Sequence, residues 1–553
     1  MNMSIMRKSR ECRGGRFLCG FIIAIGMLPL TASARNIYIT PDADGTGNGL
    51  SWNSPMMLTN YLTAANIKHD DVVRLKSGHY TAKINSATFG NYVTVKISGG
   101  YAGTDDNSLD PAFPYSDIDF ANYPTKNIFS PLVCKAKEGR SLTLERLHLR
   151  GARSTAIYKQ NAGDLHLSDC VVVSNGWRNY SGNTAAGGRG LLAQGGSVTI
   201  DKCTFAYNGM YFGAGDHTTI SDHGYGVCLK STTARLTGCT FIGNGAKISD
   251  EAPVSSIRGG GRGLALYASS AKVYAKECDF LCNRGALGGY SNSDNEADAQ
   301  GGIVVLSGNC NGSWFTNCSW VANQNLSDTT YNGNVSYGGV LTLDMSGRNY
   351  TVDVDRCTFA YNITDSANAA AGIDVRNGTL NLSNSEFAGN YAMTGNNLGV
   401  DLVVRTNGTA NVAYCLFPAT DGTHITVEET GDDKGELTMT GIVLGDADLA
   451  TDQATALSLV KTRTAEPYLV YDPSRIDEVL AFDVHPRSRT GRWTAGGFVK
   501  DKVHSPSIDA GDPDAPYGSE TEPNGGRLNL GRYGGTVEAS QSRKIEGFLV
   551  IVR

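Results

Sequence analysis

Apolar residues recur along the middle of the chain in a fixed short pattern. The pattern is apolar-x-apolar-x-x-Cys-x-Phe-x-x-Asn, and the six residues CTFAYN occur twice, starting at Cys203 and at Cys357. Within each copy the apolar positions alternate with a period of two, which is typical of β-strands. The alternation changes phase before the cysteine and again before the asparagine, which indicates a corner at each point. Looser copies are centred on Cys170, Cys239, Cys278, Cys318 and, with serine in place of cysteine, Ser385.

A further short strand led by glycine precedes each copy, so one repeat contains three short strands and three turns. Successive cysteines from Cys170 to Cys357 are 33 to 40 residues apart. Repeats of this length indicate a solenoid, a propeller or an array. The glycine-led strands begin at Gly190-Leu191, Gly226-Val227, Gly263-Leu264, Gly302-Ile303, Gly339-Val340 and Gly372-Ile373.

Three short strands per turn without a helical segment predict an all-β, right-handed parallel β-helix. A propeller would need four antiparallel strands per blade with hairpin turns, and a leucine-rich repeat would need a helix in each repeat. In a β-helix the coils stack at about 4.8 Å, so equivalent side chains form ladders along the axis. We therefore expect the cysteines and phenylalanines to stack inside. We expect the asparagines to bond to turn backbones and to adopt the left-handed conformation of a tight corner.

The first residues are typical of a signal peptide, which we place at 1–34. An apolar run from Phe17 to Leu30 ends at Ala32-Ser33-Ala34, small residues that suit cleavage. Cys19 lies at the start of this run, which disfavours a lipoprotein anchor. The apolar residues Phe548 to Val552 read as a terminal strand or the remnant of a sorting signal. The basic region before the run contains Arg7, Lys8, Arg10, Arg13 and Arg16.

Charge and cysteine usage agree with export. The chain has 48 basic and 54 acidic residues, a net charge of −6, which argues against a nucleic-acid groove. We expect a monomer that does not span a membrane after cleavage. Without Cys12 and Cys19, eleven of the 13 cysteines remain, so at least one stays free. A stacked ladder permits disulfides, but buried free thiols are the preferred interpretation, and a tetrahedral zinc site is disfavoured.

Motifs at both ends resemble those of a known family. Asp71 to Tyr80 and the stretch ISGGYAGT are similar to the first coils of secreted bacterial right-handed β-helix repeat proteins of the pectate-lyase-like superfamily, with Asp70 where a glycine is usual. The stretches SPSIDAGDPDAP and EPNGGRLNLGRYGGT resemble a choice-of-anchor Q-type C-terminal segment. The resemblance implies secretion, or display on the outer surface of a Gram-negative-type bacterium, and a family of polysaccharide lyases and surface proteins.

The domain organisation follows from the repeats and these motifs. We expect a signal peptide at 1–34, an N-terminal cap and first coils at 35–130, β-helix repeats at 131–425, and last coils with a C-terminal cap at 426–553. Leu58 to Ala65 would form a helix that covers the open end of the first coil. IDAGDPD would be a capping turn whose aspartates accept hydrogen bonds from backbone NH groups.

Candidate chemistry lies on the glycine-led strands and the long polar loops before them. Lyases of this shape need a basic residue to take a proton, and Ca²⁺ or arginine to neutralise the adjacent carboxylate. The candidate base is Lys230 or an arginine, and Arg189 and Arg262 occupy equivalent positions in GGRG segments. The alternative, surface charge on a solvated face, remains open. Aromatic residues that could stack on sugar rings are Tyr225, Tyr267 and Trp177.

Calcium is the metal that the loops would suit. Asp294, Glu296 and Asp298 occur in the oxygen-rich loop SDNEADAQ, and such loops can bind Ca²⁺. None matches the full EF-hand spacing. Two functions therefore remain: an exported protein that binds and cleaves an acidic polysaccharide by β-elimination or hydrolysis, and a non-catalytic adhesin, glycan-binding or structural surface protein.

Overall fold

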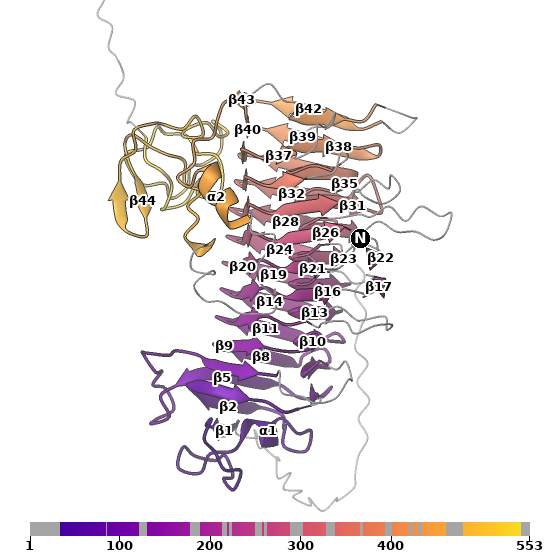
Figure 1. Ribbon diagram of the computed structural model, residues 1–553, viewed down its shortest axis with the longest axis vertical. Coiled ribbons are helices and arrows are strands. Elements are labelled where there is room, and N and C mark those ends of the chain that lie inside the picture. The colour runs from indigo at the N-terminus through magenta and orange to yellow at the C-terminus, as the bar shows by residue number, and fades with distance from the viewer. Residues whose placement is uncertain are drawn as a thin grey trace, which may run out of the picture.

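The computed structural model describes residues 34–84, 86–120, 130–176, 189–212, 218–219, 224–248, 257–258, 263–287, 302–327, 338–364, 369–392, 401–419, 424–429, 434–460 and 479–542. Within them the chain is a long stack of parallel strands (Figure 1). The predicted all-β, right-handed parallel β-helix is confirmed. No helix in these ranges is long and apolar enough to cross a membrane.

Each central coil contains four short strands, which we assign to sheets I to IV in chain order. Sheets I and II join into one 23-stranded sheet, since the 11-residue β35 (Ile373–Ser383) continues from one into the other. The other strands of sheet I are β4 (Ala87–Phe89), β7 (Leu132–Cys134), β10 (Ile157–Lys159), β13 (Leu191–Gln194), β18 (Val227–Lys230), β23 (Leu266–Ser269), β27 (Val304–Gly308), β31 (Leu341–Met345), β38 (Leu402–Val404) and β41 (Ile425–Val427).

Sheet II runs the full length of the described coils. Its strands from β8 to β39 have the same alternation of buried and more exposed residues that the repeat pattern predicted. Besides the second half of β35 they are β1 (Arg35–Ile39), β2 (Asp71–Lys76), β5 (Val95–Tyr101), β8 (Ser141–Glu145), β11 (Asp164–Ser168), β14 (Ser197–Asp201), β19 (Thr233–Thr237), β24 (Lys272–Lys276), β28 (Ser313–Thr316), β32 (Thr351–Asp355), β39 (Gly408–Ala413) and β42 (Glu436–Thr440).

Sheet III is 12-stranded and carries the Cys-to-Asn part of the repeat. Its strands are β3 (Gly78–Thr81), β6 (Ser116–Asp119), β9 (Leu147–Arg150), β12 (Val171–Val173), β15 (Thr204–Ala206), β20 (Thr240–Ile242), β25 (Asp279–Leu281), β29 (Ser319–Val321), β33 (Thr358–Ala360), β36 (Glu386–Ala388), β40 (Leu416–Phe417) and β43 (Val443–Leu444).

Sheet IV is an addition to the three strands per coil expected from the sequence. It is six-stranded, and its strands follow the asparagine corners from Asn208 to Asn390. Its strands are β16 (Gly209–Phe212), β21 (Gly245–Ile248), β26 (Arg284–Leu287), β30 (Gln324–Ser327), β34 (Ile363–Thr364) and β37 (Tyr391–Ala392), and two-residue strands β17 (Thr218–Thr219) and β22 (Ile257–Arg258) pair beyond it.

The corners depend on left-handed residues, but these are not the asparagines that end the repeat pattern. Tyr207, Cys282 and Tyr361, each directly before a ladder asparagine, have φ of 52°, 51° and 58°. A second set, including Lys202 and Arg356, lies directly before the cysteines at 49° and 52°. The expectation that asparagine itself takes the left-handed conformation is therefore wrong. The preceding residue makes the turn, which leaves the asparagine side chain free to point inward.

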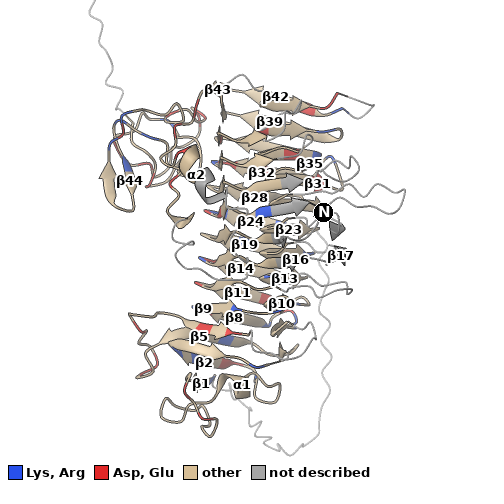
Figure 2. Ribbon diagram, in the orientation of Figure 1, with Lys and Arg blue, Asp and Glu red and all other residues tan. Residues whose placement is uncertain are grey.

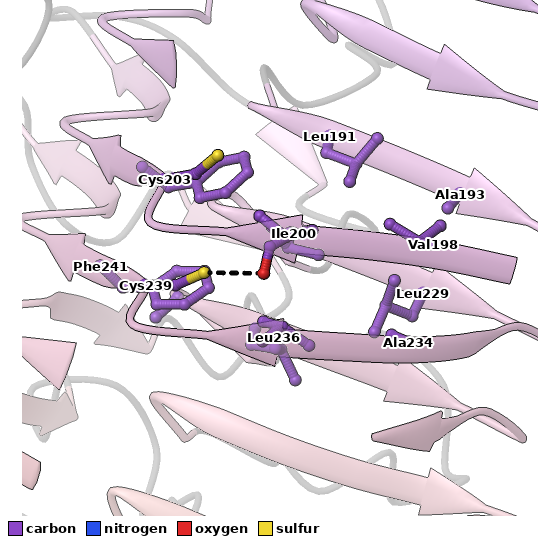
Figure 3. Close-up of a cluster of buried hydrophobic side chains, with 14 of the residues drawn as sticks. Leu191, Ala193, Val198, Ile200, Cys203, Leu229, Ala234, Leu236, Cys239 and Phe241 are labelled. Carbon is purple, nitrogen blue, oxygen red and sulfur yellow. Dashed lines mark hydrogen bonds between the residues drawn. The ribbon is translucent and has the colours of Figure 1, made fainter. Parts of the chain in front are cut away.

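The core consists of the predicted ladders. From Phe205 to Phe417 neighbouring rings stack with centroids 4.6–5.4 Å apart, the spacing of the coils. The cysteines stack beside them, and the Cys239 thiol donates to the Ile200 carbonyl of the preceding coil at 3.4 Å (Figure 3). The eleven cysteines in the described ranges are free thiols, ten buried and Cys282 half-buried, in agreement with the preferred interpretation.

Seven buried asparagines form a continuous hydrogen-bonded ladder. The Nδ2 of each donates to the Oδ1 of the asparagine in the next coil, at 3.0–3.1 Å. It also donates to a carbonyl in the preceding coil, so both amide hydrogens are used. The ladder ends where Asn390 donates to the buried carboxylate of Asp401 at 2.8 Å, which in turn contacts His424 Nδ1 at 2.8 Å. The members are Asn175, Asn208, Asn244, Asn283, Asn323, Asn362 and Asn390.

The N-terminal end is covered as expected, though by a shorter helix. Helix α1 (Leu58–Tyr61) has four residues, and Tyr61 is fully buried against the first coil. The Tyr61 hydroxyl donates to the inward carboxylate of Asp71 at 3.0 Å, which also receives Arg35 at 2.7 Å. The helix thus closes the first coil and satisfies a buried charge.

We call the chain after β43 the C-terminal segment; its described residues are 445–460 and 479–542. These residues lie on the flank of the coils, beside sheet III, and not over their end (Figure 1). The segment contains helix α2 (Gln453–Val460) and the antiparallel hairpin of β44 (Arg492–Thr494) and β45 (Gly497–Val499). Leu530 packs against outward apolar residues of sheet III, and the Arg532 and Gly534 carbonyls accept from Asn317 Nδ2 at 2.8 and 2.9 Å. For these residues the expectation of an end cap is wrong.

Candidate functional site

The predicted catalytic residues do not meet in the described part of sheet I. Lys230 is half-buried at the end of β18, and its register partners are Gln194 and Ser269. Arg189 is 6% exposed. Extending the strand register backwards places Arg189 beside Tyr225, and Tyr225 beside Leu264. Arg262 comes two residues before Leu264 in the sequence, so it is two positions out of register with Arg189. The two arginines are therefore not equivalent, and Arg262 itself lies outside the described residues.

The predicted sugar-binding and metal-binding residues are also dispersed. Tyr225 is fully buried in the main core, which leaves no ring face for a ligand in this structure. Tyr267 is 6% exposed and packs with Cys228 and Val305. Trp177, Asp294, Glu296 and Asp298 lie outside the described residues. In the ranges that are described, no group of three or more His, Cys, Asp or Glu side chains is placed to hold a metal ion.

An open surface exists instead on the outer face of sheet II. The C-terminal segment packs on sheet III, and the outward side chains of β19, β24 and β32 are exposed or half-buried. Strand register aligns the middle outward position of successive coils into one line, which we call the central row. The central row consists of Thr143, His166, Thr199, Arg235, Tyr274, Trp314, Asp353, Asn381 and Asn411.

The middle of the central row is a stack of flat side chains. The Arg235 guanidinium carbon lies 4.8 Å from the centroid of the Tyr274 ring. The Tyr274 and Trp314 centroids are 5.6 Å apart, with their planes tilted by 36°. Stacking of this kind fixes the rotamers of long side chains on an exposed sheet. The row therefore presents an ordered edge of aromatic and guanidinium groups.

The next three coils continue the central row with amide and carboxylate groups. Asn411 Nδ2 donates to Asn381 Oδ1 at 3.0 Å, and Asn381 Nδ2 donates to Asp353 Oδ1 at 2.8 Å. All the amides thus point the same way, and the series ends on the exposed carboxylate of Asp353, one coil from Trp314. The second oxygen of Asp353 and the outer amide hydrogens are available to hydroxyl groups of a ligand.

This arrangement suits a long ligand that lies along the axis of the coils. The groups repeat at the coil spacing of about 4.8 Å, and they combine ring edges with hydrogen-bond acceptors and donors. Sugar rings use both kinds of contact.

A second cluster, on the first strands of sheet III, is an ion-pair network. Arg150 contacts Asp117 at 3.0 Å and Asp119 at 3.3 Å, and His79 Nδ1 lies 2.8 Å from Asp117. The two carboxylates thus share one guanidinium. Nearby, His148 stacks on Tyr115 at 3.6 Å, and its burial lowers its pKa to about 4. The network stabilises the first coils and offers no free acid–base pair.

Sequence reasoning missed the central row because it examined inward residues and loops. The signal was present in the x of apolar-x-apolar: Thr199, Arg235, Tyr274, Asp353 and Asn381 all occupy it. Aligning that position across the copies places an arginine, two aromatic residues, an aspartate and two asparagines in consecutive coils.

Comparison with known proteins adds little to this geometry. No family model and no curated protein matches the chain. Among solved structures, pectate lyase Pel9A is 14% identical and covers 90% of this chain and 96% of its own, with a TM-score of 0.38. A rhamnogalacturonan lyase is 13% identical (79% and 95% covered, TM-score 0.29). A PL6 alginate lyase in complex with a trisaccharide is 9% identical (75% and 87%, TM-score 0.29). Scores at this level carry no argument about activity.

Proposed function

We propose that this protein is an exported polysaccharide-binding protein and that the polysaccharide lies along the central row of sheet II. The observation that carries the proposal is the run of Arg235, Tyr274, Trp314, Asp353 and Asn381 in consecutive coils. A polymer of sugar units can repeat its contacts from coil to coil, which a compact ligand cannot. The protein would act as a monomer at the cell surface or after secretion.

Binding is favoured over cleavage because of what surrounds the candidate base. Lys230 lies between Gln194 and Ser269 in adjacent strands, without a carboxylate or a second cation at those positions. β-Elimination needs a base together with a group that neutralises the substrate carboxylate. A Ca²⁺ ion bound by Asp294, Glu296 and Asp298 would supply such a group, so the test includes Ca²⁺.

The test measures retention of the full mature chain on a panel of immobilised neutral and uronate-containing polysaccharides. We expect Trp314→Ala to weaken binding to the retained polysaccharide roughly tenfold or more, since tryptophans at binding surfaces often act as hot spots. Asn381→Ala should weaken it less. Tyr92→Ala removes an aromatic side chain that is 69% exposed and does not belong to the central row, and it is the matched control.

Two outcomes contradict the proposal. Equal binding by Trp314→Ala and Tyr92→Ala would show that the central row does not bind the polysaccharide. Ultraviolet absorbance from an unsaturated product, with or without Ca²⁺, and its loss in Lys230→Ala, would identify a lyase with a site on sheet I. Arg189→Ala and Arg262→Ala would then show which cation assists.

A further inference from the structure

The hairpin of β44 and β45 exposes an aromatic pair on the outer edge of the C-terminal segment. Trp493 and Phe498 are cross-strand partners, 45% and 40% exposed. Their ring centroids are 5.3 Å apart at an interplanar angle of 68°. In Figure 1 the hairpin lies on the side of the segment that faces away from the coils. Large exposed aromatic residues side by side on a soluble surface indicate a contact site.

The backbone at Gly491 helps to fix the position of the aromatic pair. Gly491 has a φ of +140°, and a Cβ added there would lie 1.9 Å from the Phe498 ring. Phe498 therefore rests on the bare backbone of Gly491, and the ring is held in place without a side chain beneath it. An edge-on pair uses at most one ring face in its own contact, so other ring faces remain open to a ligand.

Three exposed cations accompany the pair, and no described carboxylate forms an ion pair with them. Arg489 precedes β44, while Lys500 and Lys502 follow β45. The Arg489 Nε donates to the Lys502 carbonyl at 3.0 Å, which holds the two segments together. The intervening Asp501 is already bound by Arg492, at 2.9 and 3.3 Å. The hairpin is thus locally cationic in a chain whose net charge is −6 (Figure 2).

The combination favours a sugar polymer over a bilayer. Insertion into a bilayer needs a continuous apolar face, whereas here Trp493 and Phe498 lie on one face and Val499, the partner of Arg492, lies on the other. Two rings beside three cations instead match a ligand whose rings present an apolar C–H face and whose negative charges are regularly spaced. A polysaccharide of uronate sugars has both: its rings stack on aromatic faces, and its carboxylates pair with lysine and arginine.

We propose that the hairpin of β44 and β45 is a second glycan-binding site, selective for acidic polysaccharides. Trp493 and Phe498 contact the sugar rings, and Arg489, Lys500 and Lys502 contact carboxylates. The site is separate from the central row on sheet II and does not depend on it.

The test compares binding of the full mature chain to polygalacturonate, to dextran and to vesicles containing phosphatidylglycerol. The variants are Trp493→Ala and the double variant Lys500→Glu/Lys502→Glu. Tyr517→Ala is the matched control, because Tyr517 is an aromatic residue of the same segment and is 38% exposed. All altered side chains lie on the surface, and circular dichroism checks that each variant is folded. Trp314→Ala serves as a separate reference for the central row.

We expect both hairpin variants to lose roughly tenfold or more in affinity for polygalacturonate, and Tyr517→Ala to bind normally. Added salt should weaken binding of the parent protein to polygalacturonate, since exposed charges are screened. The Trp493→Ala/Trp314→Ala combination should lose more than either change alone. Absence of polygalacturonate binding, or hairpin variants that bind it unchanged, would overturn the proposal. A loss confined to vesicle binding would overturn it in favour of a lipid surface.

Discussion

Replacement of one ladder asparagine tests how far the buried amides hold the coils together. Asn283 is fully buried in the middle of the ladder. Its Nδ2 donates to the Phe241 carbonyl at 2.9 Å and to Asn323 Oδ1 at 3.0 Å. Its Oδ1 accepts from both the backbone NH and the Nδ2 of Asn244, each at 3.0 Å. Asn283→Ala removes all four bonds at once.

The magnitude follows from the groups that lose a partner. The Asn244 NH, one hydrogen of Asn244 Nδ2 and the Phe241 carbonyl would each be left inside the core without this partner. A buried polar group without a partner costs about 1–3 kcal/mol, so we expect Asn283→Ala to lower the free energy of unfolding by about 3 kcal/mol or more. The loss should fall on the central coils, because each coil contacts only its neighbours.

Urea unfolding followed by circular dichroism measures the effect. The matched control is Asn411→Ala, which breaks the amide contact to Asn381 on the exposed face of sheet II and should change stability by about 0.5 kcal/mol or less. Equal midpoints for the two variants would refute the view that the interior ladder contributes more than an exposed one.

Three further predictions follow from buried groups. In the native protein only Cys282 of the eleven described thiols should react with a thiol reagent at neutral pH; the remaining ten should react after denaturation, because they are buried and burial raises the pKa of thiols such as Cys310 and Cys415. Gly531→Ala should release the C-terminal segment to limited proteolysis, since a Cβ there would lie 2.1 Å from Glu386 Oε1, whereas Gly526→Ala, at a similar φ with nothing within 4 Å, should not. The thermal midpoint of the parent protein should fall between acid and mildly alkaline pH, and Glu386→Gln should abolish this fall.

The inward half of the fold could be predicted because its pattern repeats. Cys203, Phe205 and Asn208 recur with constant offsets, and each offset corresponds to one ladder. Sheet IV was not predicted, because its strands, such as GMYF and GAKI, follow the asparagine that ends the repeat pattern. There the backbones approach closely instead: a Cβ on Gly209 would lie 1.6 Å from the Gly245 carbonyl.

The flank position of the C-terminal segment had a signal that went unused. The last residue of each sheet III strand from β12 to β36 points outward, where polar residues would be expected on a solvated face. It is apolar in every copy from β12 to β36, and all of these residues pack in one buried cluster with the C-terminal segment. An outward row of apolar residues requires a cover. The residues are Val173, Ala206, Ile242, Leu281, Val321, Ala360 and Ala388.

Glu386 shows how this flank contact depends on pH. The side chain points out from β36 into the interface, where the hydroxyls of Thr358 and Ser507 bind its two oxygens. Complete burial raises the pKa of the Glu386 carboxyl from its ordinary value of 4.5 to about 8. Between these two pH values the folded protein keeps a proton that the unfolded chain has lost. The stability that this proton supplies is full below that ordinary value and is lost progressively as the pH rises to about 8. At one pKa unit per 1.36 kcal/mol the loss is roughly 3–5 kcal/mol. Glutamine stays neutral and can donate to one hydroxyl, so Glu386→Gln should match the parent protein in acid and exceed it at alkaline pH. Parallel stability–pH curves for the two proteins would show that Glu386 does not carry this proton.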